Sequence, residues 1–433
     1  MEIFVKFKPI LFRKRKKSFI INNKVIKVKL KIEKIDYEGR GISHVSEKVC
    51  FVKKALPGEL VEAKLLQDEK RFSIYETTEV LTASPIRKTS LCPFSKECGG
   101  CALDIMSYED SISLKKEMLK ELFKKNNLPI KEFEIVKSSH AYGYRNKISL
   151  KIENGQLGYY KEETHQFVPI KNCLLAKPAI QNLMKDFSLF HIKNGDMTIK
   201  ANQNDELLLS INTKEKMEIE KKLIEKHKIA GIIWNNKCVY NSSFFIEHIN
   251  HIFYKVHANS FFQVNIDIAE KIALDIEKEF KKEDILYDLY CGVGYFSLKL
   301  ARITKQVLGI ELNQNAILNA NYNASLNKIS NVSFHLGKVE DILEKIPLKA
   351  NKVIVDPPRS GLHKNVRKVL KEKKKKKIIY ISCNPKTLAR DLQDLMKTYT
   401  LTSFKAYDMF PFTKHIECVC ILSKKWRMRY ENQ

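Results

Sequence analysis

The chain has 433 residues, and a length of this order predicts about three domains. With 44% hydrophobic residues it can form buried cores, which excludes a wholly disordered chain. Lysine and arginine number 77 against 50 acidic residues, and the resulting net charge of +27 favours a polyanionic partner such as nucleic acid. The sequence lacks an apolar run of the ~20 residues that a membrane helix needs, and its basic start lacks the apolar block of a signal peptide, so neither a membrane partner nor secretion is expected.

The first part of the chain predicts a basic extension over residues 1–22, followed by a small β-barrel over residues 23–83. Short segments of alternating hydrophobicity recur there at close spacing, and glycine or proline residues lie between them. Several such segments with glycine turns are typical of a small antiparallel barrel. Basic side chains recur on the predicted outer faces.

Residues 84–255 predict a central α+β domain that begins with a cysteine-bearing loop. Cys92, Cys98 and Cys101 lie within ten residues among proline and glycine, a pattern that suggests a metal site. Thiolates suit zinc and iron–sulfur clusters alike, and reactive thiols without a metal are the alternative. Ten cysteines in a chain without a secretory signal indicate the reducing cytoplasm.

Residues 256–433 alternate between predicted strands and helices, which predicts an α/β domain with a largely parallel, doubly wound sheet. The predicted strands are Ile285–Leu289, Gln306–Glu311, Val332–Leu336, Lys352–Asp356, Lys377–Ser382 and His415–Leu422.

A glycine turn follows the first of these strands and opens a helix. Gly292 and Gly294 let the backbone approach a ligand closely, and Glu311 ends the next strand, where its carboxylate can accept hydrogen bonds from ribose hydroxyls. Ser297 stands where a dinucleotide fingerprint requires glycine or alanine. The turn therefore predicts a nucleoside-type cofactor such as S-adenosylmethionine, with an ordinary tight turn as the alternative.

The later strand ends carry a possible nucleophile and base. Cys383 follows a buried-looking strand and precedes a rigid Asn-Pro loop, and Glu417 lies in an apolar strand whose burial would raise its pKa. A thiolate that adds to C6 of uracil activates C5 for methylation, and a carboxylate can then remove the C5 proton. The alternatives are a buried structural cysteine and a solvent-facing carboxylate. Asp356-Pro-Pro is followed by Arg359 and not by an aromatic residue, which argues against methylation of a base amine.

Three stretches closely resemble signatures of the RNA uracil-5-methyltransferase family: Asn259–Asn265, Asp356–Thr387 and Asp408–Glu417. The resemblance implies a Rossmann-like class I methyltransferase domain that uses S-adenosylmethionine, with Cys383 as nucleophile and Glu417 as proton acceptor. It also implies four cofactor-binding positions, which are Gln263, Tyr290, Glu311 and Asp356.

The resemblance extends to the N-terminal parts. Asp36–His44 looks like part of a TRAM domain, a small OB-like RNA-binding barrel. Cys92, Cys98, Cys101 and Cys173 look like the ligand set of a [4Fe–4S] cluster, with zinc as the alternative. Both features resemble the 23S rRNA branch of the family more than the tRNA branch. We therefore expect 5-methyluridine formation in 23S rRNA, without an obligate protein partner; tRNA uridine-54 methylation and a non-catalytic RNA-binding assembly factor are the alternatives.

The sequence departs from the family at Phe412, where glutamine, histidine or tyrosine is usual, and at Lys338, where some members place asparagine. Two arginines are predicted RNA contacts. Arg359 follows the Asp-Pro-Pro motif, and Arg145 is flanked by tyrosines, a cluster for which a packed strand is the alternative.

Overall fold

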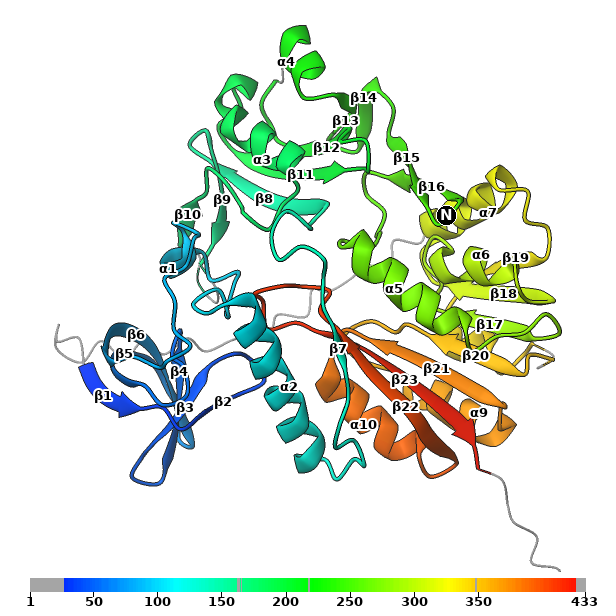
Figure 1. The fold of residues 1–433 in the computed structure, drawn as a ribbon. Coiled ribbons are helices and arrows are strands. Elements are labelled where there is room, and N and C mark those ends of the chain that lie inside the picture. The colour runs from blue at the N-terminus through cyan, green and yellow to red at the C-terminus, as the bar shows by residue number, and fades with distance from the viewer. Residues whose placement is uncertain (1–26, 162–163, 165, 217–218, 347–348, 426–433) are drawn as a thin grey trace, which may run out of the picture. The chain divides into compact units, whose positions relative to one another are not determined.

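The computed structural model describes residues 27–161, 164, 166–216, 219–346 and 349–425 (Figure 1). By its contacts the chain divides into two compact units. Of the described residues, unit 1 comprises 27–34 and 41–83, and unit 2 comprises 35–40 and those from 84 on. The predicted extension over residues 1–22 lies outside the described residues. The predicted domain borders at residues 23, 84 and 256 stay predictions.

Unit 1 is a small β domain around its own core. Its strands follow the order β1-β5-β6-β4-β3, and all neighbours are antiparallel except β4 and β6. Alternate residues such as Val61 and Ala63 point into a core that also holds Leu30, Val52 and Tyr75. The strands are β1 (Lys27–Lys31), β3 (Gly41–Val45), β4 (Lys48–Lys53), β5 (Leu60–Asp68) and β6 (Phe72–Thr82), and β2 (Lys34–Ile35) begins where the chain passes to unit 2.

The largest sheet of unit 2 confirms the predicted Rossmann-like fold. Its order is β19-β18-β17-β20-β21-β23-β22-β7, with β17 to β21 parallel and β23 antiparallel to both of its neighbours. The direction of chain progression reverses between β17 and β20, and ligands bind at such a switch point outside the carboxyl ends of the strands. The strands are β7 (Ile135–Val136), β17 (Ile285–Leu289), β18 (Gln306–Glu311), β19 (Val332–Leu336), β20 (Lys352–Val355), β21 (Lys377–Ser382), β22 (Tyr399–Tyr407) and β23 (Glu417–Lys424).

Helices cover both faces of this sheet (Figure 1). Along β21, Ile378 and Tyr380 belong to one core and Ile379 and Ile381 to another, because successive side chains of a strand point to opposite faces. Helices α2, α9 and α10 pack into the first core, and α5 and α6 into the second. The helices of this region are α2 (Tyr108–Lys125), α5 (Ile266–Glu277), α6 (Tyr295–Ala301), α7 (Gln314–Leu326), α8 (Val339–Ile342), α9 (Lys364–Lys373) and α10 (Pro385–Leu395).

The central part of the chain forms a second sheet, with the order β10-β9-β8-β11-β12-β13-β14, and a separate hairpin, β15-β16. Its strands are β8 (Lys147–Glu153), β9 (Gln156–Tyr160), β10 (Phe167–Pro169), β11 (Gly195–Ala201), β12 (Leu207–Asn212), β13 (Ile229–Trp234), β14 (Lys237–Asn241), β15 (Phe244–Ile249) and β16 (Ile252–His257). Its short helices are α1 (Ser95–Cys98), α3 (Pro178–Lys185), the 3-10 helix Phe187–Phe190 and α4 (Lys221–Lys226). Among the described residues, none of the helices has the length and apolar character needed to cross a membrane.

Candidate active site

The glycine turn between β17 and α6 forms one end of the site. The backbone at Tyr290, Gly292 and Gly294 is left-handed, with φ of 69°, 55° and 84°. The Gly292 amide donates a hydrogen bond of 3.2 Å to Oε2 of Glu311, so the end of β18 is tied to the turn. A Cβ atom built at Gly292 would have no other atom within 4 Å. A side chain there would therefore enter the space above the turn, which glycine leaves open for a ligand.

Gly294 lies immediately before α6, and it is not among the described residues that line the cavity. A Cβ atom at Gly294 would lie 3.0 Å from Cζ of Phe334. The positive φ and this close approach both favour glycine at this position, and its part in cofactor binding stays a prediction.

Carboxylates collect at the carboxyl ends of neighbouring strands. Asp288 is fully buried, and one of its oxygens accepts a hydrogen bond of 2.5 Å from the hydroxyl of Ser297 while the other has no partner. Burial raises the pKa of Asp288 to about 7, and the nearby charge of Glu311 adds to the rise. Burial and the charge of Asp288 likewise raise the pKa of Asp356. These closely spaced acidic groups favour a bound cation, which relieves their mutual repulsion.

The pairing of β21 with β23 brings Cys383 and Glu417 to the same end of the two strands. The strands are antiparallel, and their last pair joins Ser382 to Cys418. Cys383 directly follows β21, and Glu417 is the first residue of β23. Both side chains line one cavity, where they can reach a single substrate ring.

Electrostatics in this pair depend on burial and on Arg359. Burial first, and then the charges of Glu417 and Asp356, raise the pKa of the Cys383 thiol to about 11, while Arg359 opposes the rise. Burial also raises the pKa of Glu417 well above its usual range, with Asp356 adding to the rise and Arg359 opposing it. The Cys383 thiol therefore holds its proton at neutral pH in the free protein, and any added positive charge favours the ionised forms of both groups.

Arg359 is held in place through its backbone. Its carbonyl accepts hydrogen bonds from Nδ2 of Asn384 at 2.8 Å and from the hydroxyl of Thr387 at 3.2 Å. Its guanidinium Nη2 donates to Nε2 of His415 at 3.3 Å. Burial first, and then the charge of Arg359, lower the pKa of His415 to about 4, so the imidazole is neutral and can accept this bond.

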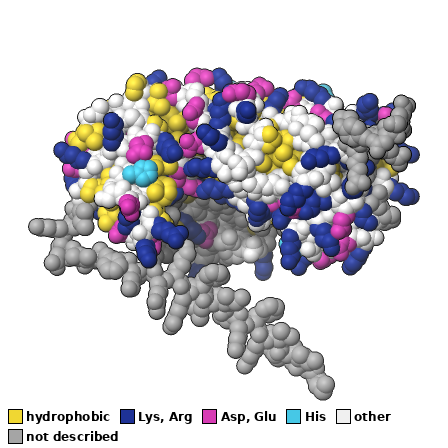
Figure 2. Space-filling view, turned by 90° about the horizontal axis from the view of Figure 1, so that it is seen from below, with side chains coloured by type: hydrophobic (Ala, Val, Ile, Leu, Met, Phe, Trp, Pro, Cys, Tyr) yellow, Lys and Arg dark blue, Asp and Glu magenta, His cyan; other side chains and the backbone are white. Residues whose placement is uncertain are grey.

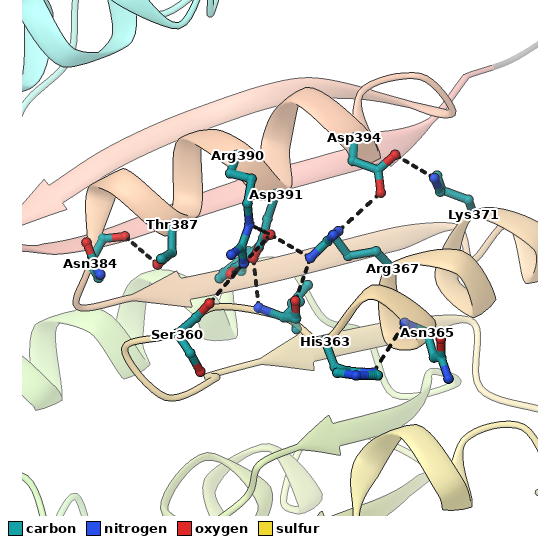
Figure 3. A network of polar contacts seen from close by, with 12 residues as sticks. Ser360, His363, Asn365, Arg367, Lys371, Asn384, Thr387, Arg390, Asp391 and Asp394 are labelled. Atoms are coloured by element: carbon teal, nitrogen blue, oxygen red, sulfur yellow. Dashed lines mark hydrogen bonds and ion pairs between the residues drawn. The ribbon is translucent and has the colours of Figure 1, made fainter. Parts of the chain in front are cut away.

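A polar network locks the loop after Asp356 onto α10 (Figure 3). Asp391 is fully buried and accepts hydrogen bonds from the Leu362 amide and the Tyr380 hydroxyl, both at 2.7 Å. It also accepts from Arg367 and Arg390, each at 2.9 Å. The loop and the turn after Cys383 are thereby fixed to the same helix.

One cavity of about 1590 Å³ joins these features. Most predicted site residues line it: Arg145, Gln263, Tyr290, Gly292, Glu311, Asp356, Arg359, Cys383 and Glu417. The sequence did not single out Phe261 or Phe410, which also line it. Phe261 is 70% exposed. The sequence feature that could have identified it as a site residue is an aromatic side chain in the segment that also contains Gln263.

The two departures from the family lie in different places. Lys338 lines the cavity. Phe412 is not among its described lining residues; its ring is buried and stacks on Tyr142 with centroids 4.8 Å apart. Tyr144 is also buried beside Phe412, so the tyrosines that flank Arg145 are packing residues while Arg145 itself faces the cavity.

Four cysteines converge on a second, smaller cavity. Cys92, Cys98, Cys101 and Cys173 line it together with Asn172, whose buried Oδ1 has no hydrogen-bond partner. In the described ranges, no three histidine, cysteine or acidic side chains lie close enough to hold a single metal ion. The four cysteines thus line the same cavity, but their side chains do not converge to metal-binding distance of one point.

The comparisons with known proteins agree with this geometry. A sequence model of the family described as tRNA (Uracil-5-)-methyltransferase matches residues 200–425. A protein of Aquifex aeolicus named as an uncharacterized RNA methyltransferase is 34% identical over 424 residues, which are 92% of this chain and 99% of that protein. A similarly named protein of Caldanaerobacter subterraneus subsp. tengcongensis is 31% identical, with 92% and 98% covered. The crystal structure of Pyrococcus abyssi tRNA (uracil-54, C5)-methyltransferase in complex with S-adenosyl-L-homocysteine has a TM-score of 0.75 and 26% identity, and covers 91% of this chain and 100% of that chain.

Proposed function

Since the chain belongs to the tRNA (uracil-5-)-methyltransferase family, whose members are S-adenosylmethionine-dependent RNA methyltransferases, we propose that it methylates C5 of a uridine through a covalent bond between Cys383 and C6. The observation that carries the proposal is that Cys383, directly after β21, and Glu417, at the start of β23, line the same cavity as the glycine turn.

Each residue has a defined task in this reaction. Cys383 gives up its proton to water, and its thiolate adds to C6 of uracil, which moves electron density to C5 as an enolate. When bound, S-adenosylmethionine supplies an electrophilic methyl group, which C5 takes up. Glu417 then accepts the C5 proton, the C6–C5 double bond reforms, and the C6–S bond breaks to return the thiolate.

The protonation states of the free site fit a reaction that starts only after binding. The raised pKa of the Cys383 thiol keeps it protonated and unreactive in the free protein. When bound in the cavity that Glu417, Asp356 and Arg359 line, a sulfonium would add positive charge, which with Arg359 would favour the thiolate and the carboxylate over their neutral forms.

The cavity fits S-adenosylmethionine at its glycine-turn end. Glu311 would accept hydrogen bonds from the ribose hydroxyls, the open space at Gly292 would receive the nucleoside, and Asp356 would lie near the positive sulfur. Gln263 and Tyr290 line the same end and would hold the remaining polar groups.

The target uridine has to leave its stack, because C6 and C5 must face the thiol and the cofactor at once. Arg145 and Arg359 line the cavity and would contact the RNA there. Figure 2 shows lysine and arginine side chains spread over one face of the molecule between acidic and apolar ones. We infer that these charges and the TRAM-like β domain bind phosphates, so affinity will fall steeply as salt rises.

The preferred substrate in this proposal is 23S rRNA, because the N-terminal β domain and the four cysteines resemble that branch. The similarity to the Pyrococcus abyssi enzyme favours tRNA uridine 54 as the second candidate.

We further propose that Cys92, Cys98, Cys101 and Cys173 hold a [4Fe–4S] cluster. The four cysteines line one cavity, which supports a shared site, and four thiolates suit such a cluster, with zinc as the alternative. A visible absorption spectrum and an iron assay after anaerobic purification test this choice.

Methyl transfer from labelled S-adenosylmethionine to RNA fractions from cells that lack this protein tests the function. The label is expected in 5-methyluridine of 23S rRNA, and label in the tRNA fraction instead would favour the second candidate. Cys383→Ala is expected to abolish transfer, whereas Cys238→Ala, at an exposed position on β14, is expected to leave it unchanged. Transfer by Cys383→Ala at the parent rate would refute the proposal.

A further inference from the structure

The turn Asp36–Arg40 belongs by its contacts to unit 2, the unit that contains the active site. It is rigid in itself. One oxygen of Asp36 accepts hydrogen bonds from the amides of Glu38 and Arg40 at 2.9 and 2.8 Å. The other accepts from the Arg40 guanidinium at 2.9 and 2.6 Å. Although the sequence pattern of this turn resembles an RNA-binding module, the carboxylate of Glu38 points to residues of the catalytic unit.

Glu38 bridges the two segments that carry the nucleophile and the base. Its Oε1 lies 2.5 Å from Nζ of Lys386, three residues after Cys383 in the first turn of α10. Its Oε2 lies 3.0 Å from Nζ of Lys414, three residues before Glu417. One carboxylate thus uses both oxygens to join the two catalytic segments.

Neighbouring residues keep the turn against these segments. The ring of Tyr37 lies under Nζ of Lys386, 5.4 Å from centroid to nitrogen, and packs against the core that contains α10. Gly39 has φ of 74°, and a Cβ atom there would lie 2.9 Å from Cβ of Ala102. The charges of Glu417 and Cys383 also reach the Tyr37 hydroxyl, whose pKa is raised mainly by burial. The turn therefore lies beside the reacting groups and has little room to shift.

We propose that Glu38 is a positioning residue, which holds the Cys383 turn and the segment before Glu417 at a fixed separation by pairing with Lys386 and Lys414 at once. The inference rests on the proposed covalent mechanism. Half-exposed ion pairs add little to stability, because water screens the charges and both side chains lose conformational freedom. A displacement of about 1 Å between reacting groups, by contrast, can cost up to roughly a hundredfold in rate.

The bridge remains charged at working pH. Burial alone would raise the pKa of Glu38, but hydrogen bonds and charge from Lys386 and Lys414 lower it to about 2. The contribution of Glu38 is therefore not expected to titrate, and the pH profile of Glu38→Gln should have the shape of the parent profile at a lower rate.

Glu38→Gln and Glu38→Asp test the inference against a matched control. Glu132→Gln removes a carboxylate that also pairs with two lysines, Lys120 at 2.7 Å and Lys116 at 3.5 Å, away from the site. Two steps are measured in single turnover: formation of a covalent complex with RNA that carries 5-fluorouridine, and release of tritium from RNA with 5-tritiated uridine. Glu38→Gln is expected to lower the rate constants of both steps roughly tenfold; in steady-state assays kcat should fall with them while KM changes less than about twofold. Glu38→Asp should be intermediate, and Glu132→Gln should match the parent.

The two lysines separate positioning from general stability. Lys386→Met should slow formation of the covalent complex more than tritium release, and Lys414→Met the reverse, because each lysine belongs to one catalytic segment. Glu38→Gln at the parent rate in both steps would overturn the inference, as would variants that change only RNA affinity and its salt dependence. If the parent itself forms no covalent complex with 5-fluorouridine RNA, the proposed mechanism fails and not this inference alone.

Discussion

A buried ion pair packs against the segment that precedes Glu417, the proposed proton acceptor, and allows a quantitative test of how this segment is held in place. Lys115 of α2 and Asp408 are 1% and 0% exposed, and Nζ of Lys115 lies 2.5 Å from Oδ1 of Asp408. The same ammonium donates hydrogen bonds to the carbonyls of Phe410 at 3.0 Å and His415 at 2.9 Å. Lys115 therefore holds both ends of the loop that leads into Glu417.

Lys115→Met removes the cation and leaves Asp408 buried without its counter-charge. Breaking a buried pair in this way costs about 3–5 kcal/mol, because the remaining charge has lost both water and partner. That loss is a large part of a total free energy of unfolding of roughly 5–15 kcal/mol. Adding Asp408→Leu should recover part of it, since an apolar pair of similar volume carries no uncompensated charge.

Urea unfolding of the full chain measures these differences. Lys120→Met is the control, because Lys120 lies on the same helix and forms an exposed pair with Glu132; it should change the free energy of unfolding by less than about 1 kcal/mol. A Lys115→Met variant as stable as Lys120→Met would refute the reasoning, as would a double variant less stable than Lys115→Met.

Three further predictions concern the cavity itself. Alkylation of Cys383 in the free protein should accelerate as pH rises toward about 11. At a given pH, Arg359→Met should slow alkylation roughly tenfold and Glu417→Gln should accelerate it, because these side chains shift the thiol pKa in opposite directions. Equal effects of the two variants would contradict the assignment. Glu311→Gln should weaken S-adenosylhomocysteine binding in calorimetry by about 1.5–3 kcal/mol, roughly 10- to 100-fold, and unchanged affinity would place the ribose elsewhere. Gly294→Ala should cost about 1–3 kcal/mol in urea unfolding with the affinity of the folded protein unchanged, and a selective loss of affinity would show that the position contacts the ligand.

Local patterns in the sequence predicted most of the large sheet. Ile285–Leu289, Gln306–Glu311 and Val332–Leu336 are strands with the predicted bounds, because each is a short apolar run between polar or glycine residues. The hairpin β15-β16 and the strand β7 were not predicted. Strand β7 has only two residues and joins the sheet solely through β22, a long-range pairing that leaves no local pattern.

The sequence predicted the site less well where contacts between distant parts of the chain determine which side chains come together. The sequence placed Cys383 after one strand and Glu417 in another, but their arrival at the same end of the strand pair follows from antiparallel pairing of β21 and β23. The burial of Lys115 could have been predicted from the sequence, because Lys115 lies on the same apolar face of its helix as Ile112 and Leu119. The exposure of Cys238 likewise follows from long-range pairing, because β14 is an edge strand with all residues open to solvent.

The most direct test of the account is to identify the protein atom that binds uracil. The protein is incubated with S-adenosylmethionine and RNA containing 5-fluorouridine, whose C5–F bond Glu417 cannot open by proton removal, so the complex should persist. We predict that digestion and mass spectrometry will find one modified peptide, in which Cys383 carries the methylated fluorouridine nucleotide. Methyl transfer to ordinary uridine with no such adduct, or an adduct on another cysteine, would contradict the account.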